Sequence, residues 1–196
     1  MNSHWRQQSN IMKQKDNGML VWITGLPGSG KTTLANAVYK KIGLVIPAIH
    51  IDGDHFRAIM GNDLGHSMKD RLENAYRITR LNKHLTDQGI TVICSTVSLF
   101  REIHRWNRKN HKKLMEIYID TPMDILMRRD QKGMYTGAAK KQVKNVRGFD
   151  QGFDMPQKPD MIIRNTGSLK NFLLHTEKIV RTIKRRNISH EKKTRK

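Results

Sequence analysis

The sequence is poor in cysteine, in aromatic residues and in long apolar stretches. Cys94 is the single cysteine among 196 residues, which excludes an internal disulfide and a cysteine-based zinc site and favours a reducing compartment. No uninterrupted apolar run approaches the roughly 20 residues that span a bilayer, and residues 1–8 lack the apolar stretch of a signal peptide. We therefore expect a cytoplasmic protein that makes no contact with a membrane.

Acidic residues are also scarce, with 17 Asp and Glu against 37 Lys and Arg and a net charge of +20. Part of this excess lies in residues 181–196, and the remainder is spread along the chain without interleaved aromatic residues that could stack on bases. This pattern favours small anionic substrates and a solvated tail over nucleic acid. An ATP-using protein that binds or processes nucleic acid stays as the alternative of a different class.

One glycine-rich segment has a specific chemical meaning. Residues 25–32 fit the pattern GxxxxGK[ST], between an apolar stretch at 19–23 and a helical pattern at 33–41. In such a loop the backbone N–H groups and the helix N-terminus surround phosphates, a lysine reaches the β- and γ-phosphates, and a Thr hydroxyl holds Mg²⁺. The sequence therefore predicts ATP and Mg²⁺ as cofactors. The expected ATP-binding residues of this loop are Gly25, Leu26, Pro27, Gly28, Ser29, Gly30, Lys31, Thr32 and Thr33.

The rest of the chain alternates short apolar runs with helical patterns, which is typical of stacked βαβ units. We expect an α/β fold with a parallel sheet of about five strands and helices on both faces, of the P-loop NTPase type. A kinase domain at 18–186 would lie between a flexible segment at 1–17 and a basic disordered tail at 187–196. The expected further strands are 48–52, 90–94, 114–120 and 159–164, and the expected further helices are 68–88, 101–111, 122–130 and one terminal helix capped by Ser168.

Two carboxylates follow the second expected strand, in the segment Asp52-Gly53-Asp54-His55-Phe56-Arg57. Ligands of open α/β sheets lie beyond the carboxyl ends of the strands, so this segment is expected to face the glycine-rich loop. One carboxylate can orient Mg²⁺, for which we expect Asp52 together with Thr32, and the other can accept a proton from a substrate hydroxyl. Arg57 is placed to bind an anionic group of that substrate.

Absent signals narrow the class further. The third strand ends in Cys94-Ser95-Thr96 without the acidic residue of motor ATPases, and residues 82–85 lack the aspartate with which GTPases read guanine. Both absences favour a small-molecule kinase. Arg128 and Arg129 end a helix before a glycine-containing loop, which is typical of a lid that closes over the transferred phosphate, and we expect Arg128 to bind ATP.

Five motifs together give a family resemblance. Residues 25–33, 52–57, 63–65, 70–74 and 130–135 match, in order and spacing, the motifs of adenylylsulfate kinases, and the likeness runs from about residue 5 to 165. The resemblance implies transfer of the ATP γ-phosphate to the ribose 3′-hydroxyl of adenylyl sulfate. It also implies that Asp54, Arg57, Arg71, Asn74 and Lys132 contact this acceptor and that Val97 and Ser98 line its pocket.

Ser98 occupies the serine position that descriptions of the family mark as a phosphoserine intermediate. Direct in-line transfer to a bound hydroxyl needs no covalent step, so we expect Ser98 to position the acceptor. The expected catalytic residues are Lys31, Asp52, Asp54 and Ser98.

The sequence departs from the family where the acceptor base is held. His66 and Val146 stand where the family has two phenylalanines that enclose the adenine, and stacking on an aromatic ring is worth roughly 1–3 kcal/mol per base. Residues 94–98 and 106–108 resemble related kinases found with surface-polysaccharide genes, one of which phosphorylates cytidine diphosphoramidate. Adenylyl sulfate is our first choice of acceptor, and a cytidine nucleotide, bound by His66 and Val146, is the alternative. As a protein partner, a second copy in a homodimer is kept open.

Overall fold

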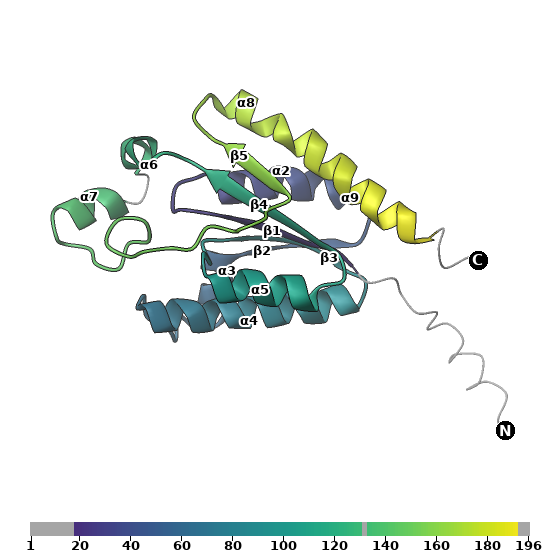
Figure 1. Cartoon of the computed structure of the whole chain (residues 1–196), viewed down its shortest axis with the longest axis horizontal. Coiled ribbons are helices and arrows are strands. Elements are labelled where there is room, and N and C mark those ends of the chain that lie inside the picture. The colour runs from purple at the N-terminus through teal and green to yellow at the C-terminus, as the bar shows by residue number, and fades with distance from the viewer. Residues whose placement is uncertain (1–17, 131–132, 192–196) are drawn as a thin grey trace, which may run out of the picture.

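The computed structural model describes residues 18–130 and 133–191 (Figure 1). Its centre is a five-stranded sheet in the order β2-β3-β1-β4-β5, in which every neighbouring pair is parallel. This confirms the α/β fold with a parallel sheet. The strands are β1 (Leu20–Gly25), β2 (Ala48–Asp52), β3 (Thr91–Thr96), β4 (Leu114–Asp120) and β5 (Met161–Arg164).

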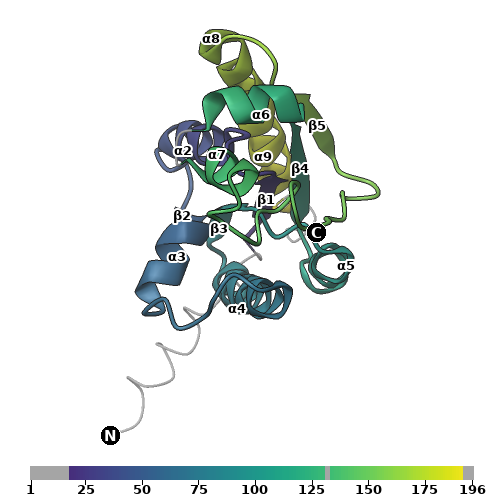
Figure 2. The same cartoon turned by 90° about the vertical axis from the view of Figure 1, so that its left-hand side faces the viewer.

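Helices cover both faces of the sheet. One face carries α2 (Lys31–Ile42), α8 (Leu169–Leu173) and α9 (His175–Glu191). The opposite face carries α3 (Gly53–Ile59), α4 (Met68–Asp87) and α5 (Arg101–Asn110) (Figure 1). Figure 2 looks onto the carboxyl ends of the strands, where the short helices α6 (Met123–Arg129) and α7 (Met134–Ala139) lie in front of the sheet.

Strand β1 begins with an apolar run that has no polar alternation. All six of its residues are buried, because both faces of the sheet are covered. Val21 and Ile23 pack in one core cluster with α2 and α9, whereas Leu20 and Trp22 pack in a second cluster with α4 and α5. Successive side chains of a strand point to opposite faces, so one apolar run supplies both cores.

The C-terminal helical region differs from the single helix expected from sequence. Ser168 does cap α8 by accepting from the Asn171 N–H, but α8 ends at Leu173 and α9 starts afresh at His175. Leu169, which we expected on the buried face, is 60% exposed. No glycine or proline occurs between 175 and 191, and α9 continues to Glu191, so residues 187–191 are helical where we expected the start of a disordered tail. Residues 1–17 and 192–196 lie outside the described residues.

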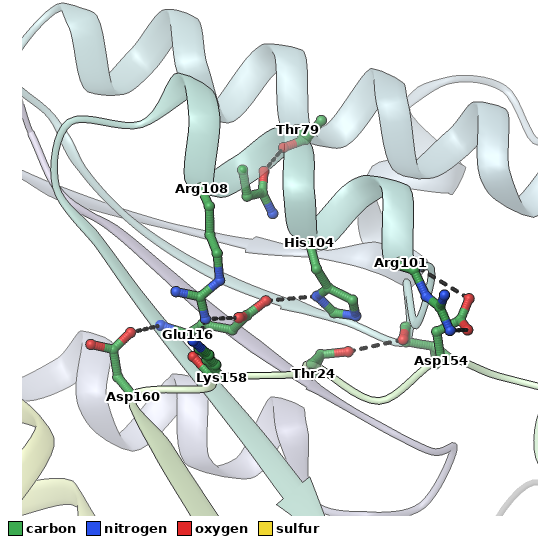
Figure 3. A network of polar contacts seen from close by, with 11 residues as sticks. Thr24, Thr79, Arg101, His104, Arg108, Glu116, Asp154, Lys158 and Asp160 are labelled. Atoms are coloured by element: carbon green, nitrogen blue, oxygen red, sulfur yellow. Dashed lines mark hydrogen bonds and ion pairs between the residues drawn. The ribbon is translucent and has the colours of Figure 1, made fainter.

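A buried polar network fixes α5 to the sheet (Figure 3). Glu116 of β4 has no exposed surface, and its two carboxylate oxygens contact His104 and Arg108 of α5. The Glu116 backbone N–H donates to Asp160, which also accepts from Arg186 of α9. Helix α5 is thus held by charged groups where it crosses β4. Among the described residues, no helix combines the length and apolar character needed to span a membrane.

Candidate active site

A cavity of about 900 Å³ lies at the carboxyl ends of the strands. Segments far apart in the sequence line it: the loop after β1, the start of α3, the end of β3, the α6–α7 region and the β5–α8 connection. Its volume is in the range of natural ligand sites. Its position is the one that the topology of a parallel sheet predicts.

The glycine-rich loop forms one end of this cavity. Gly28 and Gly30 have φ angles of 77° and 99°, a backbone conformation that favours glycine. A Cβ on Gly30 would lie 2.9 Å from the Asn165 amide nitrogen, which donates to the Ser29 carbonyl at 2.8 Å. The connection after β5 therefore packs directly behind the phosphate loop.

Most of the residues predicted to bind ATP line the cavity. Lys31 is among them, and its Nζ donates to the Leu26 carbonyl at 2.8 Å. Gly25, Leu26 and Ser29 are not: Ser29 is fully buried, and Leu26 packs in a core cluster under the loop. The predicted residues that do line the cavity here are Pro27, Gly28, Gly30, Lys31, Thr32 and Thr33.

Asp52 joins the phosphate loop to helix α3. Its Oδ2 accepts from the Thr32 hydroxyl at 2.8 Å and from the Ser95 hydroxyl at 2.7 Å, and its Oδ1 accepts from the Asp54 N–H at 3.0 Å. Burial alone would raise the pKa of Asp52, but hydrogen bonds from Ser95, Thr32 and the α3 backbone outweigh it, so the pKa lies below its usual value. The carboxylate is therefore ionised at neutral pH and caps α3.

The predicted acceptor residues gather at the other end of the cavity. Arg57 donates to the carbonyls of Leu64 and Gly65 at 2.6 and 3.0 Å. Arg71 donates to the carbonyls of His66 and Asn145 at 3.0 and 2.9 Å, which ties two loops together. The predicted acceptor residues that line the cavity are Asp54, Arg57, His66, Arg71, Asn74, Val97 and Ser98.

Two of these side chains have environments that set their chemistry. Burial, together with the charges of Arg71 and Arg57, lowers the pKa of His66, so its ring is neutral at neutral pH and can stack on a base. The Ser98 hydroxyl is 2.8 Å from the Thr96 hydroxyl, and Ser98 is 8% exposed. Ser98 therefore sits on the wall of the cavity, held by its neighbour.

Val146 does not lie where we expected it. It is 3% exposed and packs in the cluster of Leu26, Leu99 and Tyr135, outside the residues that line the cavity. The residue that follows it, Arg147, lines the cavity instead. The apolar side chain gains more from the core than from a polar cavity, which places its neighbour at the site.

Of the two arginines at the end of α6, the one expected to bind ATP does not face the cavity. Arg128 is exposed and pairs with Asp124 one turn earlier, at 3.0 Å. Arg129 lines the cavity, and its Nη2 donates to the Asn165 carbonyl at 3.2 Å. Consecutive helical residues point about 100° apart, so only one of the two can face the cavity. Lys132, predicted to bind the acceptor, lies outside the described residues.

Sequence reasoning missed how α7 is attached. Asp130 accepts from the N–H groups of Tyr135 and Thr136 at 3.0 and 2.7 Å and so holds the first turn of α7. The Tyr135 hydroxyl donates to the Pro27 carbonyl of the phosphate loop at 3.0 Å. The aspartate placed ahead of this segment is a sequence signal that could have found the helix.

The segment after β5 was also missed as part of the site. We expected Leu169 and Phe172 to be core residues of a terminal helix; Phe172 is buried in the core, Leu169 is exposed, and both also line the cavity next to the phosphate loop. Asn165 and Gly167 join them there. An apolar stripe on a helix gives no sign that its first turn borders a ligand site.

Comparison with known proteins identifies the family. Residues 17–164 match the family described as Adenylylsulphate kinase. The chain belongs to the adenylylsulphate kinase family. This membership makes it an ATP-using kinase that transfers a phosphoryl group to an alcohol.

Individual relatives of this family member differ in their acceptors. It is 43% identical over 153 residues to the cytidine diphosphoramidate kinase of Campylobacter jejuni, covering 78% of this chain and 89% of that one. It is 36% identical over 164 residues to the adenylyl-sulfate kinase of Clostridium acetobutylicum, covering 81% and 79%. The solved Mycobacterium tuberculosis APS kinase CysC in complex with AMPPNP and APS superimposes with a TM-score of 0.78 at 32% identity, covering 86% of this chain and 98% of that one.

Proposed function

We propose that this kinase transfers the γ-phosphate of ATP to the ribose 3′-hydroxyl of a pyrimidine nucleotide of the cytidine diphosphoramidate kind. The observation that carries this choice is the acceptor end of the cavity. His66 lines it, Val146 is in the core, and Arg147 lies against Phe100. The acceptor end therefore offers one imidazole ring for stacking, with a guanidinium beside it, in place of the pair of aromatic rings expected for adenine. The relative at 43% identity acts on a cytidine nucleotide, according to its name.

The donor nucleotide is assigned to the phosphate-loop end of the cavity. Backbone N–H groups of residues 28–32 and the Lys31 ammonium would hold the β- and γ-phosphates. Arg129, which lines the cavity beside Asn165, is the arginine best placed to meet the transferred phosphate. Residues 167–172 would then border the base of ATP.

Mg²⁺ fits the oxygen groups at this end. The Thr32 hydroxyl and the ionised Asp52 carboxylate are hard oxygen ligands joined by a hydrogen bond of 2.8 Å. Within the described residues, no group of three or more His, Cys, Asp or Glu side chains forms a metal cluster. Such a sparse set of protein ligands suits an ion that is bound mainly through substrate phosphates and water. The ion would neutralise charge on the transferred phosphoryl group.

Asp54 is the proposed general base. Asp52 accepts hydrogen bonds at both carboxylate oxygens and is assigned to Mg²⁺ with Thr32, and Asp54 lines the same cavity at the start of α3. In the transfer, the 3′-oxygen forms a bond to the γ-phosphorus, the bond to the bridging oxygen of ATP breaks, and ADP leaves. The proton of the 3′-hydroxyl goes to Asp54. Ser98 and Asn74 border this point and are assigned to positioning the ribose.

Adenylyl sulfate is the second candidate acceptor. A solved relative at 32% identity was determined with APS, and the relative at 36% identity is an adenylyl-sulfate kinase. The residues expected to contact either acceptor through its ribose and phosphate, among them Arg57 and Arg71, are the same for both.

Transfer of radiolabelled phosphate from ATP to each acceptor distinguishes the candidates. We expect a higher kcat/KM with cytidine diphosphoramidate than with adenylyl sulfate. We also expect ³¹P NMR of the product to place the new phosphate at the 3′-position. A higher kcat/KM with adenylyl sulfate would contradict this proposal and support adenylyl sulfate as the acceptor, which was the first choice from the sequence. Labelling at another hydroxyl would contradict the assignment of Asp54.

A further inference from the structure

The strongest unexplained feature near the site is a buried arginine. Arg147 is 1% exposed, among the largest fully buried side chains, and it lines the acceptor end of the cavity. Its guanidinium carbon lies 4.1 Å from the centre of the Phe100 ring, so the cation is stacked on an aromatic face. A planar group fixed in this way can meet a ligand in one orientation.

The contacts of Arg147 do not use all of its N–H donors. Its Nη1 donates to the Gly152 carbonyl at 2.6 Å and contacts the Met68 sulfur at 2.7 Å, and its Nη2 donates to the Leu99 carbonyl at 2.9 Å. These contacts account for three of the five N–H groups of a guanidinium. The Nε–H and one N–H on Nη2 are left, and Nε and Nη2 are neighbouring nitrogens of the planar group.

The hydrogen bonds of Arg147 do not neutralise its charge. Its contacts by hydrogen bond are with carbonyls and a thioether, which carry no formal charge. Burial lowers its pKa, with a further contribution from the charge of Arg71, and Asp154 opposes both. Donors held in such a place favour a ligand that presents acceptors and disfavour one that presents N–H groups.

We propose that Arg147 determines which base the acceptor nucleotide carries, by donating from its remaining edge to O2 and N3 of cytosine. This inference rests on the proposed function. Cytosine has two neighbouring acceptors at these positions, which match the parallel N–H groups of an arginine edge. Uracil has an N–H at position 3, which would face an arginine N–H, and adenine has C2–H in place of the second acceptor, so neither offers two neighbouring acceptors. The stack on Phe100 would keep the edge in line with the base plane.

Acceptors that differ only in the base test this role directly. We would measure kcat/KM for the diphosphoramidates of cytidine, uridine and adenosine with the wild type, with Arg147→Lys and with Arg147→Thr. The lysine variant keeps the positive charge and loses the pair of N–H donors. Arg105→Lys, on the exposed face of α5, is the matched control. Melting temperature and ATP binding report whether each variant is folded.

The wild type is expected to prefer cytidine over uridine and adenosine by at least about fivefold, the smaller end of what a good bidentate contact gives. Both Arg147 variants should reduce this preference to below about threefold, and Arg105→Lys should preserve it. Equal use of the three bases by the wild type overturns the role of Arg147, whether or not the variants fold. Variants that lose activity equally on all three bases overturn it too, because a purely structural arginine would give that result. In both cases 3′-phosphorylation of a nucleotide would remain, whereas failure to phosphorylate any nucleotide contradicts the proposed function itself.

Discussion

Lys31 is the residue whose chemistry follows most directly from its position. Its Nζ lies within the phosphate loop, bonded to the Leu26 carbonyl, at the end of the cavity assigned to ATP. Lys31→Ala should lower kcat by 10²–10³-fold, the usual order of effect when a group that stabilises transition-state charge is removed. Lys40→Ala, on the exposed side of α2, is the control and should retain wild-type turnover. A folded Lys31→Ala enzyme with near-normal kcat would contradict a catalytic role for this loop.

Asp54 and Asp52 can be separated experimentally because they are assigned to different tasks, Asp54 to the acceptor hydroxyl and Asp52 to Mg²⁺. Asp54→Asn should lower kcat by roughly 10²–10⁴-fold while the Kd for ATP changes little, since a general base acts on the acceptor hydroxyl. Steady-state kinetics and ATP titration measure the two effects, with Asp124→Asn on exposed α6 as the control. If ATP affinity collapses while kcat at saturation survives, Asp54 belongs to the metal side and Asp52 becomes the candidate base.

Sequence spacing predicted some side chains of the site well and others poorly. Thr32 and Asp52 were expected together because each follows a parallel strand at the same edge of the sheet, and their side chains are hydrogen-bonded. Val146 was placed by matching a family motif, which gives a position along the chain but no direction for the side chain. Arg147 was overlooked because a basic residue in a basic protein carries no signal until its burial is known.

At the scale of elements, Tyr135 joins α7 to the phosphate loop, through a core cluster shared with Leu26 and through its hydroxyl. Burial, with a contribution from Asp130, raises the pKa of Tyr135 to about 12, so its phenol stays protonated and donates to the Pro27 carbonyl. Tyr135→Phe removes this bond and little else. At about 1 kcal/mol for a hydrogen bond, the KM for ATP should rise about fivefold. Tyr39→Phe on α2 is the control, and an unchanged KM in Tyr135→Phe would mean that α7 does not support the loop.

Elements with a clear apolar run or period were predictable, including the five-residue strand β2, whereas the short helices α7 and α8 were not. Strand β4 and the bounds of α4 agree with their hydrophobic patterns within a residue or two. Helix α7 has six residues and is stabilised by the side chain of Asp130, so it has no period to detect. The break at Leu174 between α8 and α9 contains no glycine or proline, so the sequence does not signal it. The two helices differ in their packing: α9 lies against α2, and α8 borders the cavity.

For the whole molecule, His111 predicts a loss of stability in mild acid. It lies buried after α5, with Nδ1 3.3 Å from the Thr86 hydroxyl and its ring against Trp106. Burial, with a smaller contribution from the charge of Lys83, lowers its pKa to about 4, although Asp87 opposes this. In the unfolded chain a histidine has a pKa near 6.5, so between about pH 6.5 and 4 the unfolded chain is protonated at His111 and the folded chain is not. The free energy of unfolding therefore falls as the pH drops from about 6.5 towards 4.

His111→Phe tests this because it keeps an aromatic ring and cannot titrate. The Thr86 hydroxyl still has the Lys83 carbonyl as a partner, so the change leaves no new unpaired donor there. Chemical denaturation at pH 7 and pH 5 should show a loss of stability about 2 kcal/mol smaller in the variant than in the wild type. His84→Gln, exposed on α4, should behave as the wild type. An equal pH dependence in His111→Phe and the wild type would exclude His111 as its source.

The three arginines at the acceptor end all donate hydrogen bonds to main-chain carbonyl oxygens. Arg57 donates to residues 64 and 65, Arg71 to residues 66 and 145, and Arg147 to residues 99 and 152. These hydrogen bonds are therefore independent of the side chains at the residues whose carbonyls accept them. Evolution can exchange a phenylalanine for His66 without moving the wall on which it stands. A scaffold of this kind can pass from one nucleotide to another by single substitutions, each of which leaves a folded and active enzyme on which selection can act.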